Sequence, residues 1–192
     1  MTEAEPAPTS PTWGRIARRI RVPLGFLFAV FYLWRARPDW LSLALGGAVV
    51  VLGVFLRAMA SGHVEKNQQL ATTGPYAYTR NPLYLGSIII AIGFANASRD
   101  VWVAIGIVVF FAVIYVPVIR AEEAFLRQQF PEYESYAQHV PRLLPRSLWF
   151  SGLTTNFSRE LYLRHREYNA LIGAAAVLAA LVVKMHWFPY SW

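Results

Sequence analysis

Long apolar stretches separated by short polar segments run along the whole chain. A helix needs about 20 apolar residues to cross the hydrocarbon core of a bilayer, and five stretches are long enough to be considered. The expected spans are residues 22–34, 40–56, 82–98, 101–119 and 169–186. The first is short, so we expect it to span fully or to form half of a tilted hairpin. The pattern predicts an all-α integral membrane bundle of about five transmembrane helices, with cytoplasmic interfacial helices beside it.

The N-terminal residues follow a different pattern. Residues 1–12 are rich in proline, alanine, serine and threonine, a composition typical of a disordered tail. Glu3 and Glu5 lie where a signal peptide would be basic, and no apolar core follows directly. Residues 13–21 mix arginines with tryptophan and isoleucine and predict a basic helix lying on the membrane surface. We expect residues 13–192 to form one membrane domain.

Composition supports the membrane assignment. The 192 residues are 56% hydrophobic and only 15% charged, and the mean hydropathy is +0.34. Soluble domains carry about 25% charged residues. The chain has no cysteine, which excludes disulfides, thiolate metal ligands and cysteine nucleophiles. The net charge of +7 favours contact with anionic lipid, and no basic, aromatic-interleaved module favours nucleic acid.

The basic residues predict an orientation. With the N-terminus in the cytoplasm and five crossings, fourteen of the 18 basic residues fall on inside segments. The remaining four are Arg35, Arg37, Arg99 and Lys184. This is a strong positive-inside bias. It places both chemically interesting segments, residues 74–86 and 120–146, on the cytoplasmic face, which is the plasma (inner) membrane face if the source is bacterial.

Glycines on two spans predict close helix packing. Gly46, Gly47 and Gly53 lie on the second span, and no strand precedes them as a nucleotide-binding fingerprint would require. Gly86 and Gly93 lie seven residues apart on the third span. We expect these glycines to mark contact faces.

The segment Gly74–Gly86 combines turn, aromatic and charged residues at the start of the third span. Asn81 and Pro82 predict a helix start, with asparagine as N-cap and proline at the first helical position. Arg80 lies beside the free N–H groups of that helix, a suitable seat for a carboxylate or a phosphate, including a lipid phosphate. The segment also holds three tyrosines, Tyr76, Tyr78 and Tyr84. They either stack on a base or contact a sulfonium, or they belong to the interfacial aromatic belt.

A pair of acids follows the fourth span. Glu122 and Glu123 lie at a helix end where carbonyls make the potential negative, so a cationic or hydroxyl-rich partner is expected nearby. Pairing with Arg120 and Arg127, or plain solvation, is the structural alternative, since adjacent side chains do not share a helix face. Pro117 predicts a kink just before this pair.

Few other residues suggest chemistry. His63 and His139 stand alone, so no metal site is expected. Ser87 and Ser98 have no base partner in sequence and no nucleophile context.

Two motifs in register resemble one enzyme family. Residues 74–86, read as Gly-Pro-Tyr, then Arg-Asn-Pro-Leu-Tyr-Leu-Gly, resemble the GPY-x-x-x-R-(H/N)-P-x-Y-x-G signature of the isoprenylcysteine carboxyl methyltransferase and phospholipid methyltransferase superfamily. Residues 122–142 resemble its EE-x-x-L-x-x-x-F-G-x-x-Y-x-x-Y-x-x-x-V-P-R region. Asn81 stands where the eukaryotic isoprenylcysteine enzymes have histidine, and Pro131 replaces the usual glycine. The resemblance covers about residues 40–145.

The resemblance implies an S-adenosyl-L-methionine site at the cytoplasmic membrane surface. The implied cofactor-binding residues are Gln68, Gln69, Leu70, Ala71, Gly74, Tyr76, Asn81, Pro82, Leu83, Tyr84, Glu122 and Glu123. The expected catalytic residues are Arg80, Glu123 and Arg142.

The expected function is isoprenylcysteine-carboxyl-methyltransferase-like O-methylation of a lipophilic carboxylate, with a lipid-like or prenylated acceptor drawn from the bilayer. A carboxylate is ionised at neutral pH and needs no base; we expect Arg142 and Arg120 to orient it. Phospholipid N-methylation and thiol S-methylation are alternatives, and an amine would require a base such as Glu123 or His139. A non-catalytic membrane scaffold is the alternative of another class. Sterol-type reductases use a nicotinamide cofactor and many more spans, so the chain length argues against them.

Overall fold

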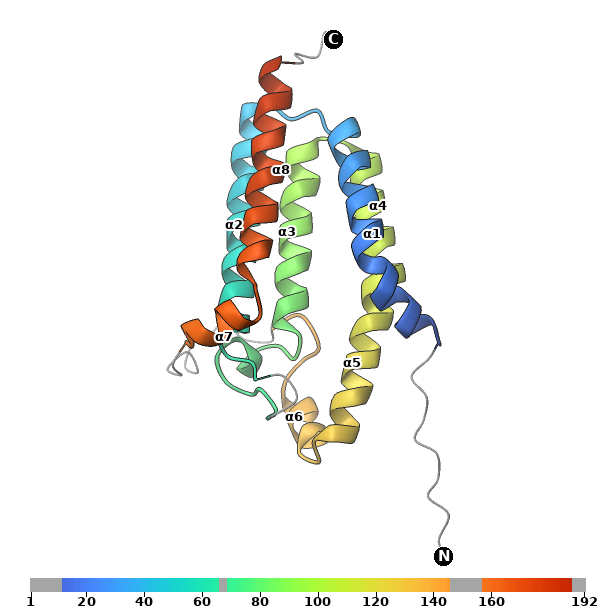
Figure 1. The fold of residues 1–192 in the computed structure, drawn as a ribbon, viewed down its shortest axis with the longest axis vertical. Helices are drawn as coiled ribbons and strands as arrows, with labels where there is room; N and C mark the ends of the chain where they lie inside the picture. The colour runs from blue at the N-terminus through green and yellow to red at the C-terminus, as the bar shows by residue number, and fades with distance from the viewer. Residues whose placement is uncertain (1–11, 66–68, 146–156, 188–192) are drawn as a thin grey trace, which may run out of the picture.

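Five long helical rods run side by side in alternating directions (Figure 1). The computed structural model describes residues 12–65, 69–145 and 157–187. The rods are α1 (Thr12–Arg35), α2 (Trp40–Ser61), α3 (Pro82–Ser98), the continuous α4 (Val101–Phe110), η2 (Phe111–Tyr115) and α5 (Val116–Gln129), and α8 (Tyr168–Trp187). The shorter elements are the 3₁₀ helix η1 (Gly74–Ala77), α6 (Tyr133–His139) and α7 (Arg159–Arg164).

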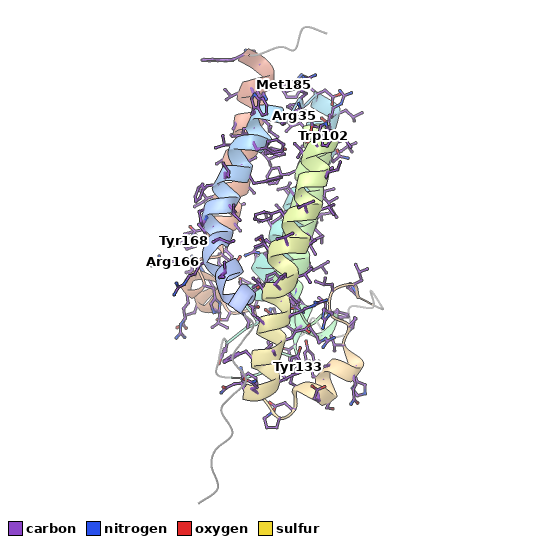
Figure 2. The ribbon with its side chains drawn as sticks, turned by 90° about the vertical axis from the view of Figure 1, so that its right-hand side faces the viewer. Arg35, Trp102, Tyr133, Arg166, Tyr168 and Met185 are labelled. Carbon is purple, nitrogen blue, oxygen red and sulfur yellow. The ribbon has the colours of Figure 1, made fainter. Side chains whose placement is uncertain are left out.

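The two ends of the bundle differ. We call the end where α2 stops and α3 starts the loop end; it also holds α6 and α7 (Figure 1). The opposite end, the far end, holds the connections between α1 and α2 and between α3 and α4. Figure 2 shows Arg35, Trp102 and Met185 at the far end and Tyr133 at the loop end.

The predicted all-α membrane bundle is confirmed. Among the described residues, α2, the continuous Val101–Gln129 helix and α8 are long and apolar enough to cross a membrane. Two shorter apolar stretches, Val22–Arg35 and Pro82–Ser98, lie beside them. Because many large apolar side chains on these helices are exposed, a lipid environment is the solvent that suits them. The protein is an integral membrane protein.

Three helix boundaries differ from those expected. The basic segment 13–21 and the first apolar stretch form one helix, α1, with Pro23 inside it. Membrane helices tolerate an internal proline because neighbouring groups satisfy the freed backbone. Helix α2 continues past residue 56 to Ser61 and so carries Arg57 within it. Of the tail expected over residues 1–12, only Thr12 is described, and it begins α1; residues 1–11 lie outside the described part.

Paired glycines bring α2 and α3 into contact, as predicted. A Cβ atom added to Gly46 would lie 2.5 Å from the carbonyl oxygen of Gly93, and one added to Gly53 would lie 2.7 Å from that of Gly86. Each pair is seven residues from the other on both antiparallel helices. Backbones this close leave no room for a larger side chain. Helix α3, held against α2 by this contact, forms one wall of the site described below.

Charged side chains join the helices at the far end. Arg35 forms an ion pair with Asp100 at 2.6 Å, and Arg99 pairs with Asp39. Lys184 of α8 donates from Nζ to the carbonyl oxygen of Trp34 at 2.9 Å, at the C-terminus of α1 where a cation is favoured. The helices are therefore tied together at the end away from the loops.

Candidate active site

The loop between α2 and α3 folds around a glycine. Gly74 has a φ of +58°, a region that side chains with a Cβ rarely adopt, and a Cβ there would lie 2.5 Å from the His63 ring. Pro75 follows as the second residue of the 3₁₀ helix η1, where its fixed φ favours the turn. Gly74, Pro75 and Tyr76 are all buried. The loop is thus a packed part of the structure.

Hydrogen bonds join this loop to the chain after α5, about 60 residues away. Arg80 donates its backbone N–H to the carbonyl oxygen of Pro141 at 2.9 Å. The Thr79 hydroxyl donates to the carbonyl oxygen of Arg142 at 3.2 Å. The Tyr136 hydroxyl donates to the carbonyl oxygen of Tyr76 at 2.7 Å. The two sequence motifs therefore form one unit at the loop end.

A buried carboxylate lies at the centre of this unit. Glu123 is 2% exposed; it accepts from Arg142 Nη2 at 2.7 Å and from Arg142 Nε at 3.0 Å. Asn81 Nδ2 donates to Glu123 Oε1 and to the Arg142 carbonyl oxygen, both at 3.1 Å. The hydrogen bond to Glu123 raises the pKa of Arg142 above its usual value. The three residues form an interlocked triad.

This triad corrects the expected role of Asn81. Asn81 occupies the N-cap position of α3 and Pro82 the first helical position, as predicted, but the Asn81 side chain makes no capping hydrogen bond. The N–H groups of its amide are donors, and they satisfy the buried carboxylate of Glu123 instead of capping the helix.

A cavity of about 1300 Å³, which we call the amphiphilic cavity, lies beside the triad. Its polar part, at the loop end, is lined by Gln69, Leu70, Ala71, Tyr76, Arg80, Asn81, Glu122, Tyr133 and Tyr136. Its apolar part extends between α1, α3, α4 and α8 and is lined by Gly25, Phe28, Phe94, Ile107, Phe110, Phe111 and Gly173, among others. One continuous space therefore borders both polar loops and the hydrocarbon-facing helices.

Aromatic rings form much of the apolar wall. Phe28 stacks on Phe110 with ring centres 5.9 Å apart, and Tyr84 meets Tyr115 edge to face at 5.7 Å. The π-helical turn η2 places Phe111 and Tyr115 on this wall, with their ring centres 4.3 Å apart. The π-helical turn ends at Tyr115, two residues before Pro117, where a kink was expected; such turns are frequent at functional sites.

The cavity separates the predicted cofactor residues into two groups. Those that line it are Gln69, Leu70, Ala71, Tyr76, Asn81, Leu83, Tyr84 and Glu122. Gly74, Pro82 and Glu123 are buried beside the cavity and are not among its lining residues. Gln68 lies outside the described residues. Of the predicted catalytic residues, Arg80 lines the cavity, whereas Arg142 is engaged with Glu123.

The adjacent acids thus have different surroundings. Glu123 points into the triad and Glu122 borders the cavity, because neighbouring residues on a helix face different directions. Arg120 and Arg127, the alternative partners, do not pair with either acid: Arg127 pairs with Glu134 at 2.7 Å, and Arg120 is exposed and not among the lining residues.

Arg80 has an unpaired donor. Its Nε atom is buried and has no hydrogen-bond partner, one of two such side-chain atoms in the described residues. Its Nη1 atom lies 3.5 Å from the Tyr133 hydroxyl, at the limit of a hydrogen bond. A buried, unsatisfied guanidinium nitrogen at a cavity wall is suited to a ligand that supplies an acceptor.

Burial sets the ionisation of the tyrosines around the polar part. Burial raises the pKa of Tyr76 well above its usual value, and neighbouring Tyr136 and Glu122 raise it further. Burial also raises the pKa of Tyr136 and of Tyr133. These phenols remain neutral hydrogen-bond donors at physiological pH.

The charged pair Arg57 and Glu167 also lines the cavity and was not predicted as part of the site. Arg57 Nη2 lies 2.8 Å from Glu167 Oε2. The available signal was an arginine directly after an apolar span, because ionisable residues at membrane depth are functional candidates. Glu167 is 110 residues away in sequence and carries no local signal. The described charged residues of the lining are Arg57, Glu65, Arg80, Glu122 and Glu167, a formal charge of −1.

Fold and site together define an integral membrane protein with a polar loop site that opens onto an apolar chamber. Residues 40–133 match the model of the phospholipid methyltransferase family. The chain is 30% identical to the nickel-cobalt-cadmium resistance protein NccN of Alcaligenes xylosoxydans xylosoxydans, over 78% of the chain and 75% of the relative. The chain belongs to the phospholipid methyltransferase family.

A second relative gives a similar match. The chain is 32% identical to the cobalt-zinc-cadmium resistance protein CzcN of Cupriavidus metallidurans, over 70% of the chain and 66% of the relative's length. The chain thus spans slightly less than two thirds of this relative. No solved structure matches the chain.

Proposed function

We propose that this protein is an integral-membrane, S-adenosyl-L-methionine-dependent methyltransferase that O-methylates the carboxylate of a lipophilic acceptor. The observation that carries the proposal is the amphiphilic cavity, in which polar loops and an apolar helix-lined chamber share one space. A methyl donor that is water-soluble and an acceptor that is lipid-soluble require a site with both surfaces. Membership of the phospholipid methyltransferase family supports the reaction class.

The polar part of the cavity fits the cofactor. S-adenosyl-L-methionine carries a carboxylate, an ammonium, a sulfonium and an adenosine. The unpaired Nε of Arg80 suits the carboxylate, and the formal charge of −1 on the described part of the lining suits a ligand with a net positive charge. Tyr76 offers a ring for a base or sulfonium, and Gln69–Ala71 offer backbone groups.

The cofactor supplies an activated methyl group on its sulfonium. The chain's own residues bind the cofactor and the acceptor, orient them toward each other and exclude water from the site. We assign cofactor binding to Glu122, Arg80 and the lining residues of the α2–α3 loop. We assign Glu123 and Arg142 a positioning role, because their ion pair and Asn81 hold the loop and the segment after α6 together.

A carboxylate acceptor is favoured over an amine because a carboxylate needs no base, and the two residues considered as a base for an amine are engaged elsewhere or exposed. An ionised carboxylate attacks without losing a proton, whereas an amine must lose one. The two bases named for an amine are poorly placed: Glu123 is paired inside the triad, and His139 is exposed, with Nδ1 at 2.8 Å from the Ser135 carbonyl oxygen. Phospholipid N-methylation remains the competing function, supported by the family's description.

We also propose an orientation and a setting. The basic-residue bias supports a cytoplasmic loop end, on the side where the cofactor is available. The names of NccN and CzcN support a role in cells exposed to nickel, cobalt, zinc or cadmium. We propose that this role is exerted through methylation of a membrane component.

The test uses purified protein in lipid nanodiscs with methyl-tritiated S-adenosyl-L-methionine. The acceptors are an S-farnesylated N-acetylcysteine and, in a separate reaction, phosphatidylethanolamine. Methyl esters release volatile tritiated methanol in base, whereas methylamines do not. Base-labile label on the farnesylated carboxylate, lost in Arg80→Gln, supports the proposal. Base-stable label on phosphatidylethanolamine alone would replace it with N-methylation, and no label on either acceptor would contradict it.

A further inference from the structure

Arg57 and Glu167 face each other on the wall of the amphiphilic cavity, outside the two family motifs. Both oxygens of Glu167 are engaged: Oε2 accepts from Arg57 Nε at 3.1 Å and Nη2 at 2.8 Å, and Oε1 accepts from Nη2 at 3.0 Å. This fork-to-fork arrangement is the way arginine recognises a planar carboxylate. A carboxylate site therefore exists on this wall, and the chain's own acid fills it.

The arginine is held by other groups as well. Arg57 Nη1 donates to the carbonyl oxygen of Leu83 at 3.2 Å and to the hydroxyl of Ser87 at 2.5 Å. Both partners belong to α3, which packs on α2 through the paired glycines. The guanidinium thus keeps its position on α2 and α3 whether or not Glu167 is present, and only its Nε–Nη2 edge depends on the acid.

The acid comes from a less regular segment. Glu167 lies between α7 and α8, and it follows Arg166, a non-glycine residue with a φ of 54°. Figure 2 shows Arg166 and Tyr168, its two neighbours, at the lower end of α8. A side chain at a junction between helices can move with less disturbance than one inside a helix.

Arg57 also lies at the boundary between the two parts of the cavity. Its partners Leu83 and Ser87 are on the first turns of α3, just beyond Arg80 and Asn81, and all four line the cavity. From Glu167 the lining continues onto α8 through Ala170 to Gly173, where a Cβ would meet nothing within 4 Å. A lipid with an acidic head and an apolar chain has room to place its head at Arg57 and its chain along α8.

We propose that Arg57 is the acceptor-binding cation: its Nε–Nη2 edge takes the carboxylate of the lipophilic acceptor, and Glu167 holds that edge until the acceptor displaces it. The inference rests on the proposed function for the identity of the acceptor. It assigns the two arginines of the described lining to two different anions, with Arg80 for the cofactor and Arg57 for the acceptor. Glu167 is an internal competitor for the acceptor.

The test measures binding of tritiated palmitate to the detergent-purified protein without cofactor, with tritiated hexadecanol as the neutral probe. Glu167→Gln keeps the size of the side chain and removes its charge, so palmitate is expected to bind at least about fivefold more tightly, since a neutral amide competes less well than a carboxylate for a guanidinium. Arg57→Gln is expected to weaken palmitate binding at least about tenfold. Hexadecanol binding is expected to stay within about twofold in both variants.

Glu65→Gln is the matched control, because it removes the same charge from the cavity lining at a residue that does not bond Arg57. An equal gain in palmitate affinity in Glu65→Gln would overturn the proposal, as would an unchanged or weaker affinity in Glu167→Gln. If Arg57→Gln does not fold, Arg57→Lys replaces it; the charge is kept and the two-pronged edge is lost, so weaker palmitate binding is again expected. Because no cofactor is present, a failure of methyl transfer with these results intact would overturn the proposed reaction and leave the acceptor site standing.

Discussion

The ion pair between Glu123 and Arg142 gives the most quantitative prediction. Glu123 is 2% exposed, and after Arg142→Gln its charge would keep the hydrogen bond from the Asn81 amide. Breaking a fully buried ion pair costs about 3–5 kcal/mol. The Arg142 side chain is 47% exposed, so water reaches the carboxylate after the substitution and reduces the penalty. We expect Arg142→Gln to lower the free energy of unfolding by about 2 kcal/mol.

The companion variant is Glu123→Gln. Its amide oxygen still accepts from Asn81 and Arg142, so the expected loss is about 1 kcal/mol. In the double variant no charge is left buried, and the loss is expected to be smaller than the sum of the two single losses by about 1–2 kcal/mol. Unfolding in mixed detergent micelles, followed by circular dichroism, measures the free energy of unfolding of the parent protein, the two single variants and the double variant. Single losses that add to within about 0.3 kcal/mol in the double variant would refute the interlocked triad.

Three further predictions concern packing, the far end and pH. Gly46→Ala is expected to destabilise the bundle by at least about 2 kcal/mol by overpacking. The control Gly173→Ala, whose Cβ meets nothing within 4 Å, is expected to change the free energy of unfolding by no more than about 0.5 kcal/mol. Unfolding in detergent compares the two variants, and equal losses would contradict the close α2–α3 contact. Lys184→Met removes the donor to the last carbonyls of α1. It is expected to lower the free energy of unfolding by about 1 kcal/mol, with no change in S-adenosyl-L-methionine affinity. Burial raises the pKa of Tyr136 and Tyr76, so the folded protein holds protons that unfolded tyrosines release near pH 10, and stability is complete below that pH and falls above it. Unfolding measured from pH 8 to 11 should therefore show a steeper alkaline fall in the parent protein than in Tyr136→Phe, and identical slopes would contradict the assignment.

The apolar pattern of the sequence predicted the long helices of the bundle, but it predicted the first and last residues of these helices less well. The span expected over residues 82–98 coincides with α3 because Pro82 and the turn at Arg99 mark both ends. Helix α1 extends through the basic residues because arginine is a good helix former and Pro23 does not end the helix. The π-helical turn η2 has no recognisable signal in a run of apolar residues.

The parts of the site formed by residues close together in sequence could be predicted, whereas contacts between residues far apart in sequence could not. The loop that begins at Gly74 was recognisable from its turn residues, and the structure joins it to the second motif. Sequence alone did not separate Glu122 from Glu123, because their roles depend on which way each points from α5. The partnership of Arg57 with Glu167 depends on where α8 starts relative to α2, which only the folded bundle shows.

The central claim is that the polar part of the amphiphilic cavity binds S-adenosyl-L-methionine, and titration calorimetry on the purified protein tests it most directly. The account predicts saturable binding at one site per chain. Glu122→Gln is expected to weaken this binding at least about tenfold without changing the unfolding midpoint, because Glu122 borders the cavity and makes no contact in the triad. No saturable heat, or an affinity unchanged by Glu122→Gln and Arg80→Gln together, would contradict the claim.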